Sequence, residues 1–455
     1  MEGLMGSYTD FSIGGYDLLT SKSYVEPVFM TVFKETDKKI TPVEVDGDKE
    51  IDQHRSIRYA VSASIAKERL GVMGFSLRKT RLDFDREKKV EAEYLEEVIQ
   101  DQEEENRDLS AEDAGQLDVH NRQPDPDEFL DSWLVGKQKE LDLLRRSTFD
   151  DFLDGFRFLN VHSLSPYLPQ YQEIPSDVPE LVRFMLSDDE DRLLRFPCTD
   201  PRFLIRAFLE TAEDEEEVVQ DISSVVDAGY YDDSDSVCEQ AIESLIADYP
   251  VNQRIIILTE GSTDSSILDR SLRLLFPHLA GYYTFMDFEA SNAAGSAGVL
   301  VGTIKAFAGA GITNRVIALF DNDTAAEDAI RGLKKTKIPD NIRFAQYPPI
   351  EIAKTYPSIG PGGMLAEMDI NGLACSLELY FGVDVLRSEG GMTPIQWTGY
   401  NRALNRYQGE ILDKDRLIEG YRRKLDDCEA DTSRIDSMDF GTMRLLLREV
   451  FAVFQ

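Results

Sequence analysis

The sequence predicts a mixed α/β protein whose second half contains a parallel sheet flanked by helices. Two short, wholly apolar runs, Ile255–Leu258 and Val316–Phe320, are typical of strands that are buried on both faces. Stretches with helical spacing alternate with such runs, which indicates strands joined by crossover helices. We expect strands at 255–258, 284–288, 316–320 and 342–347 and helices at 264–276, 299–307 and 324–335. In sheets of this kind, functional groups gather beyond the carboxyl ends of the strands.

The remainder of the 455-residue chain is long enough for further domains. A mixture of β-branched runs and charged breaks predicts an N-terminal α+β module, and amphipathic spacing with prolines at helix starts predicts a helical middle region. A polar, acidic stretch between them is typical of a linker. The predicted order is an α+β module at 1–95, an acidic linker at 96–128, a helical region at 129–250, an α/β core at 251–350 and a C-terminal extension at 351–455 that completes the site of the core.

The net charge of −36 is the dominant feature of the composition. Such a chain repels nucleic acid at long range, so any contact with nucleic acid requires local basic patches or bridging cations. No apolar run approaches the ~18–20 residues of a membrane helix, and the N-terminus lacks a secretory pattern. The four cysteines are dispersed, as is typical of reduced thiols. We therefore expect a cytoplasmic protein without membrane contact.

Acidic residues follow both of the apolar runs. Glu260 and Asp264 come after the first run, and Asp321 and Asp323 come after the second. Gly261 is expected to allow a sharp turn beside Glu260. Carboxylates that lie a few Å apart in a partly dry cleft repel one another by about 4 kcal/mol per pair, so a proton or a cation must compensate them. Magnesium binds carboxylates together with phosphate oxygens. Alternatively, the two motifs only cap helix N-termini.

An apolar strand that ends in Glu-Gly, followed by one that ends in Asp-x-Asp, resembles the Toprim domain of topoisomerases, bacterial primases, recombination proteins and OLD-family nucleases. The resemblance implies that Glu260, Asp321 and Asp323 hold Mg²⁺ or Mn²⁺. OLD-like nucleases carry a further acid where this chain has Asp264.

The same resemblance implies later acids for a second metal ion and a lysine beyond them. Asp369 and Glu378 are the candidate acids, and Lys414 is the candidate catalytic lysine. The two acids are about two and a half helical turns apart and need not share a face. Each could instead cap a helix or lie exposed, and Lys414 could be a solvated residue.

The N-terminal stretch MGSYTDFSIGGYDLLTSKSYVEPVFMTVFKETDKK resembles the module that precedes HEPN or Toprim domains in prokaryotic conflict and defence proteins, over about residues 5–240. Arg157 and His162 match the spacing of HEPN ribonucleases, although Pro166 would end that helix early. No phosphate-binding loop motif occurs, so any ATPase would be a separate chain.

The resemblances together imply a magnesium-dependent endonuclease that cleaves DNA or RNA in antiphage defence, with one or two metal ions. A phage-derived trigger and a homo-oligomeric state are compatible with this expectation. The alternative is a Toprim-bearing sensor or scaffold that acts only with a partner protein. The strong acidity and the scarcity of basic clusters favour that alternative, whereas the acids at the strand ends favour the enzyme.

Overall fold

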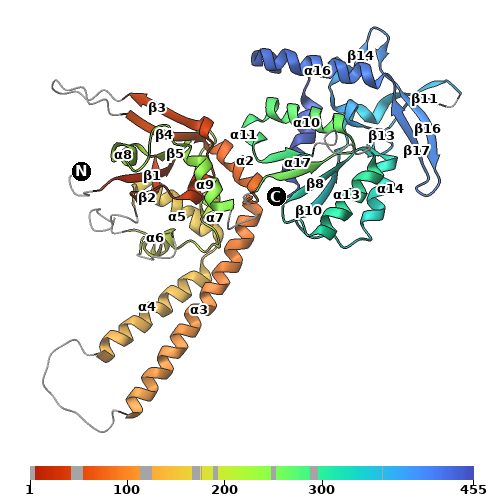
Figure 1. Ribbon diagram of the computed structural model, residues 1–455. Helices are drawn as coiled ribbons and strands as arrows, with labels where there is room; N and C mark the ends of the chain where they lie inside the picture. Colours follow the sequence, from red (N-terminus) through yellow and green to blue (C-terminus); the bar gives the residue numbers. More distant parts are fainter. Residues whose placement is uncertain are drawn as a thin grey trace, which may run out of the picture. The chain divides into compact units, whose positions relative to one another are not determined.

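The computed structural model describes residues 6–42, 55–112, 126–165, 175, 177–187, 193–246, 253–286, 296–360 and 362–455. The chain divides into two compact units. The first consists of Met1–Leu70 and Gly74–Leu245, and the second of Gly71–Met73 and Ile246–Gln455. Figure 1 shows the elements of both units. Among the described helices, none combines the length and the apolar character needed to cross a membrane.

The first unit is built on a five-stranded antiparallel sheet with the order β2-β1-β5-β4-β3. Its strands are β1 (Tyr8–Ile13), β2 (Tyr16–Lys22), β3 (Lys38–Pro42), β4 (Arg55–Ser62) and β5 (Glu217–Asp221). The central strand β5 lies within the stretch for which the sequence predicted only helices. Its short alternating pattern, in which Val218 and Gln220 are buried, is hard to recognise next to an acidic run. The sheet is therefore completed by a strand from far along the chain.

Two long helices, α3 (Leu77–Glu112) and α4 (Pro126–Arg146), lie side by side in the first unit (Figure 1). Helix α3 continues through the first half of the stretch that was predicted to be a linker, whereas 113–125 lie outside the described residues. Leu95 and Ile99 are four residues apart and pack against Leu141 and Leu144, so one apolar stripe holds an otherwise acidic helix in place.

Within the predicted helical region at 129–250, the chain is interrupted between α4 and α5 (Phe149–His162). Thr148 causes the interruption because its side chain accepts a hydrogen bond from the Asp151 amide at 3.2 Å, while the Asp151 carboxylate accepts one from the Thr148 amide at 2.7 Å. This capping box starts a new helix. The other elements of the unit are α1 (Pro27–Met30), η1 (Glu35–Asp37), α2 (Ala63–Met73), α6 (Glu180–Met185), η2 (Leu193–Arg195), α7 (Pro201–Phe208), η3 (Leu209–Thr211), α8 (Ser223–Asp227) and α9 (Val237–Ile246).

The second unit contains the predicted parallel sheet, with the order β10-β8-β6-β7. The strands are β6 (Ile255–Leu258), β7 (Tyr283–Phe285), β8 (Val316–Phe320) and β10 (Ile342–Gln346), and helices α10 (Ser262–Leu275), α13 (Ala297–Ala310) and α14 (Thr324–Leu333) follow the expected alternation. Every residue of β8 is buried. The two faces of the sheet contribute to two separate apolar cores, as a sheet with helices on both faces requires.

The C-terminal residues of the second unit pack against one face of this sheet and also form a second sheet, β12-β11-β16-β17. Its strands are β11 (Tyr356–Ile359), β12 (Leu365–Met368), β16 (Ile395–Asn401) and β17 (Arg406–Ile411). Two short strands, β9 (Asn322–Asp323) and β13 (Ala374–Cys375), pair with each other. The other elements are α11 (Pro277–Ala280), η5 (Glu351–Thr355), η6 (Leu377–Tyr380), α15 (Val383–Leu386), β14 (Arg387–Ser388), β15 (Gly391–Met392), α16 (Lys414–Ala430), η7 (Thr432–Ser437) and α17 (Gly441–Ala452).

Candidate metal centre

Two neighbouring parallel strands bring the first pair of acids together. Leu258 of β6 is paired with Ala318 of β8, so Glu260 and Asp321 leave the sheet at the same edge. The Oε1 atom of Glu260 accepts a hydrogen bond from the Asp321 amide at 3.1 Å. The sequence prediction that these two residues meet is therefore consistent with the geometry of the sheet.

The turn between β6 and α10 presents Asp264 at the same edge. Gly261 is the N-cap of α10 with a φ of −149°, an extended conformation that any residue can adopt. The expected need for glycine in this turn is therefore not supported by the structure. The turn is held instead by the buried Thr259 hydroxyl, which donates to the Gly261 carbonyl at 2.8 Å and lies 2.7 Å from the Ser265 hydroxyl. Asp264 then occupies the first turn of the helix.

The Asp321 carboxylate lies in a place that is unfavourable for a negative charge. Its Oδ1 atom is buried and has no hydrogen-bond partner within the described part of the chain. Burial, followed by the charges of nearby carboxylates, raises the pKa of Asp321 well above its ordinary value. A buried carboxylate oxygen without a partner is costly. Its charge therefore needs compensation that the described residues do not supply.

The pKa values of Glu260 and Asp264 are both raised to about 7. Burial is the largest cause in each case. For Glu260 the Asp323 charge adds to this rise, and for Asp264 the charges of Glu378 and Glu260 do so. Mutual repulsion in a poorly solvated site is the physical reason, and such shifts are concentrated at functional sites.

Asp323 combines two roles. Its Oδ1 atom accepts a hydrogen bond from the Ala326 amide at 2.7 Å and caps α14, as the alternative reading of the motif expected. Its pKa is nevertheless raised, because burial outweighs the hydrogen bonds from the Ala326 and Ala325 amides. Glu260 is not an N-cap residue, since Gly261 occupies that position of α10, but it accepts a backbone hydrogen bond from Ala297 at the start of α13. Helix capping therefore accounts for part of both motifs, and it does not account for the burial that raises the pKa values of these carboxylates.

Glu378 reaches the same site through the pairing of β9 with β13. Ala374 is opposite Asp323, and the chain then enters η6, where Glu378 is 7% exposed. Lys414, at the start of α16, places its ammonium 3.9 Å from Oε1 of Glu378. Glu260, Asp264, Asp321, Asp323 and Glu378 are called the acid cluster below.

Asp369 lies apart from the acid cluster. It is exposed, and its Oδ1 atom accepts hydrogen bonds from the amide and the side chain of Asn371, both at 3.0 Å. Asn371 in turn donates to the Ile350 carbonyl at 3.2 Å. Asp369 is not among the charges that shift the pKa values of the acid cluster. Of the two later acids that the sequence proposed, the fold brings only Glu378 to the strand edge.

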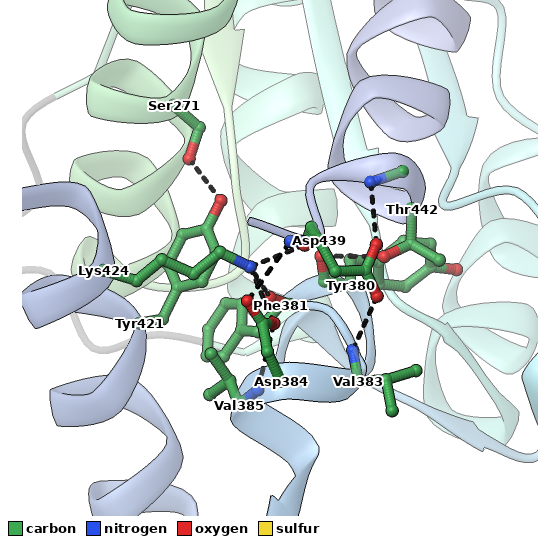
Figure 2. A network of polar contacts seen from close by, with 11 residues as sticks. Ser271, Tyr380, Phe381, Val383, Asp384, Val385, Tyr421, Lys424, Asp439 and Thr442 are labelled. Carbon is green, nitrogen blue, oxygen red and sulfur yellow. Dashed lines mark hydrogen bonds and ion pairs between the residues drawn. The ribbon is translucent and has the colours of Figure 1, made fainter. Parts of the chain in front are cut away.

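The backbone that follows Glu378 is fixed by a buried lysine, Lys424 of α16 (Figure 2). Its ammonium donates to the Phe381 carbonyl at 2.9 Å, to the Asp384 carboxylate at 2.8 Å and to the Asp439 carbonyl at 2.5 Å. Burial lowers the pKa of Lys424, and the hydrogen bond and charge of Asp384 oppose that shift. Gly382 has a φ of +95°, and a Cβ there would lie 2.1 Å from the Asp439 carbonyl oxygen.

The sequence did not reveal two further residues at this site. Tyr347 follows β10, and burial followed by the charges of Asp264, Asp321 and Glu260 raises the pKa of its hydroxyl well above its usual value. Glu410 of β17 adds a charge that raises the pKa of Asp323. The position of Tyr347 at the end of a predicted strand could have indicated it, whereas no local pattern distinguishes Glu410.

The chemistry of these residues fits a hard cation. All five side chains of the acid cluster offer oxygen atoms, which Mg²⁺ prefers as ligands. The partnerless Oδ1 atom of Asp321 is available to coordinate a cation. Among the described residues, no three His, Cys, Asp or Glu side chains already converge in a metal-binding arrangement. Two carboxylates are turned instead onto backbone amides of the site. The donor set therefore fits a cation if these carboxylates turn away from the amides.

The HEPN-like residues lie in the first unit on α5. Both Arg157 and His162 are exposed. The Arg157 guanidinium forms an ion pair with Asp154 at 2.6 Å, and the His162 ring lies 4.2 Å from that of Phe158. Pro166 is outside the described residues.

The fold and the acid cluster define an α/β protein with partly buried carboxylates at the carboxyl edge of a parallel sheet. The family model for HEPN/Toprim N-terminal domain 1 matches residues 5–249, more than half of the chain. The protein belongs to this family. The match ends before β6 begins, so the acid cluster lies outside it. Searches of curated proteins and of solved structures found no match.

Proposed function

We propose that the protein is a magnesium-dependent nuclease that cleaves phosphodiester bonds at the acid cluster. The observation that carries this proposal is the buried, partnerless oxygen of Asp321 among carboxylates whose pKa values are raised. Structural carboxylates are normally hydrogen-bonded or paired with cations. A cluster of five acids whose partners are backbone amides, one serine hydroxyl and one lysine has far more negative than positive charge, and it is suited to a ligand that brings positive charge.

In this proposal Glu260, Asp321 and Asp323 hold one Mg²⁺ or Mn²⁺ ion, and Asp264 and Glu378 contribute to a second. The bound ions would supply Lewis-acid stabilisation of the attacking and leaving oxygens of a phosphodiester. Lys414 lies beside Glu378 and is 41% exposed, so its ammonium can approach a phosphate group and offset its negative charge.

The family supports a nucleic-acid-directed role, because its description joins this N-terminal domain to HEPN and Toprim domains. The resemblance of the second unit to OLD-like Toprim nucleases agrees with that role. We further propose that the activity serves antiphage defence in the cytoplasm, with a phage-derived trigger or a separate ATPase as partner. A homo-oligomer is compatible with the proposal.

The test is a cleavage assay with purified full-length protein on single-stranded DNA, duplex DNA, RNA and tRNA, across a series of divalent metals. We expect cleavage that requires Mg²⁺ or Mn²⁺ and that Glu260→Gln abolishes while the thermal unfolding transition is retained. Asp415→Asn, an acid of the neighbouring α16 turn, is the matched control and should cleave like the wild type. An inactive wild type on all four substrates would contradict the proposal.

The second candidate is a sensor or scaffold that acts only with a partner protein. The net charge of −36 and the lack of preassembled metal ligands among the described residues favour it. Calorimetry of Mg²⁺ and Mn²⁺ binding separates the two functions, since the nuclease must bind metal and lose that binding in Glu260→Gln. If the variant binds metal as the wild type does, the acid cluster is not the metal site, whichever of the two functions holds.

A further inference from the structure

Two exposed tyrosines lie opposite each other on the hairpin that β16 and β17 form. Tyr400 pairs with Tyr407 in the antiparallel register, and their ring centroids are 5.1 Å apart. The two side chains are 48% and 49% exposed. Trp397 continues the row, because its ring centroid is 5.8 Å from that of Tyr407. Trp397, Tyr400 and Tyr407 are called the hairpin platform below.

The backbone of β17 is shaped to hold this row. Gly409 is opposite Trp397, and a Cβ at Gly409 would lie 2.9 Å from the Trp397 ring. The missing side chain lets the indole lie against the strand. Trp397 is thereby buried to 8% exposure, and Tyr407 rests on a fixed neighbour while part of its own surface stays open.

Helix α14 runs along the hairpin and connects the platform to the acid cluster. Thr324, the residue after Asp323, donates its hydroxyl to the Tyr407 carbonyl at 2.6 Å. About one turn later Glu327 forms an ion pair with Arg406. Another turn on, the Arg331 guanidinium donates to the Ala403 carbonyl at 3.4 Å. The hairpin platform therefore begins beside Asp323 and follows a helix that is ~15 Å long.

Basic side chains are concentrated along this path in an otherwise acidic chain. They belong to the last turn of α14, the residues after it, the turn of the hairpin and the start of β17, and all of them are exposed: Arg331, Lys334, Lys335, Arg402 and Arg406. The acids of the same helix and hairpin are Glu327, Asp328 and Glu410, and Glu327 is already paired with Arg406. The surplus of positive charge complements phosphate groups.

A cross-strand aromatic pair can also serve the hairpin alone, where it contributes roughly 0.2–1 kcal/mol. The Tyr400 hydroxyl is indeed bonded to Asn405 in the turn. That role explains the pairing of the rings. It does not explain why the exposed rings lie on a hairpin that carries arginines and whose backbone is bonded to the residue after Asp323.

We propose that the hairpin platform binds an unpaired nucleic-acid strand and leads it to the acid cluster. This inference rests on the proposed function and specifies its substrate class. Bases stack on Tyr400 and Tyr407, while Arg331, Arg402 and the lysines after α14 contact the phosphates. Stacking on aromatic rings requires open base faces, which a duplex conceals. Recognition through ring faces and phosphates is independent of base sequence.

The test measures the fluorescence anisotropy of a labelled single-stranded oligonucleotide, as DNA and as RNA, with full-length protein in EDTA. The Tyr400→Leu/Tyr407→Leu variant is expected to bind at least tenfold more weakly, because each stacked base contributes about 1–3 kcal/mol. The Tyr400→Phe/Tyr407→Phe variant retains the rings and should bind within about threefold of the wild type. Tyr94→Leu removes a tyrosine of the first unit that is even more exposed and is the matched control.

Two further measurements examine the path itself. Arg402→Gln should reduce the slope of log Kd against log salt concentration by about 0.7, the value for one phosphate contact with a single strand. In Trp133→Phe protein, Trp397 is the remaining tryptophan of the two in the chain, and bound oligonucleotide should quench its fluorescence. Thermal unfolding of each variant shows whether the hairpin still folds, and single Tyr400→Leu and Tyr407→Leu variants replace the double variant if it does not.

The outcomes distinguish this inference from the proposed function. Binding that is unchanged in the leucine variants, absent at low salt, or as tight for a duplex of the same sequence would overturn the hairpin platform, even if metal-dependent cleavage is found. Tyrosine-dependent binding of single strands, without metal binding or cleavage, would support the platform and refute the nuclease.

Discussion

The second unit contains two buried clusters of polar groups that differ in how completely their charges are paired. Lys424 lies within hydrogen-bond distance of three oxygen atoms, and together with them it is called the Lys424 network. The acid cluster has five carboxylates, and among the described residues the one cation within 4 Å of it is Lys414, at 3.9 Å from Glu378. Both groups adjoin η6. A network that is complete without a ligand is suited to hold a fold, whereas an incomplete one is suited to bind.

The largest expected effect separates the two later acids that the sequence proposed. Glu378→Gln should lower the rate of metal-dependent cleavage by more than tenfold, and Asp321→Asn by roughly 10³-fold or more, as expected when a group that stabilises the transition state is lost. Asp369→Asn should change the rate less than about threefold, because Asp369 is bonded to Asn371 outside the cluster. Single-turnover cleavage rates at saturating Mg²⁺ measure all three. Equal losses of cleavage rate in the Asp369 and Glu378 variants would contradict the conclusion that only Glu378 belongs to the acid cluster.

The next effect is on folding. Lys424→Met should lower the free energy of unfolding by about 2–4 kcal/mol, because two backbone carbonyls and Asp384 lose their donor. Gly382→Ala should act in the same direction, since its Cβ has no room beside Asp439. Urea unfolding followed by circular dichroism gives the change. A Lys424→Met protein as stable as the wild type would show that the network is dispensable.

Lys414→Met is the counterpart on the same helix. The Lys414 side chain is 41% exposed, so the substitution should alter the unfolding free energy by no more than about 0.5 kcal/mol. The cleavage rate should fall about 10–100-fold if its ammonium faces the phosphate. Measuring the unfolding free energy and the cleavage rate of both lysine variants tests whether Lys424 serves stability and Lys414 serves activity. A loss of stability in Lys414→Met would argue against this division of roles.

The smallest expected effect is a pH dependence of the metal-free protein. Folding raises the pKa of Glu260 from 4.5 to about 7, so the folded state holds this proton more tightly than the unfolded state. The resulting stabilisation is complete below about pH 4.5 and is lost as the pH rises through about 7. In EDTA, the stability of Glu260→Gln relative to the wild type should therefore increase from pH 5 to pH 8. The expected increase in the relative free energy of unfolding is on the order of 1 kcal/mol, or roughly 2–4 °C in melting temperature.

Differential scanning calorimetry at both pH values measures this difference. Millimolar Mg²⁺ at pH 8 should raise the melting temperature of the wild type and leave that of Glu260→Gln nearly unchanged. A difference in melting temperature between the two proteins that does not change with pH would mean that folding does not raise the pKa of Glu260.

The parallel sheet could be predicted because its strands are continuous apolar runs. The four residues of β6 and the five of β8 have no polar interruption, and acids directly after such strands must leave at one edge. Longer-range features could not be predicted. Glu378 reaches the cluster through the pairing of Ala374 with Asp323, and neither of these two-residue strands has a periodicity to detect.

The same limit applied in the first unit. Strand β5 completes a sheet from a distant part of the chain, and α3 remains helical through acidic residues because Leu95 and Ile99 have partners on α4. Composition describes a segment by itself, whereas these outcomes depend on what the segment packs against. Tertiary contacts overrode local preference in both cases.

Helix α17 has a consequence for the order in which the second unit can be built. Phe451 of α17 packs against Phe276 and Tyr283, at ring-centroid distances of 5.0 and 5.6 Å. The hydroxyl groups of Ser271 and Tyr421 meet at 3.0 Å across 150 residues. Contacts of such long range form slowly. During synthesis, the contacts of Phe276 and Tyr283 with Phe451 cannot form until α17 has emerged, so a nascent chain carries the acids long before the second unit is fully packed.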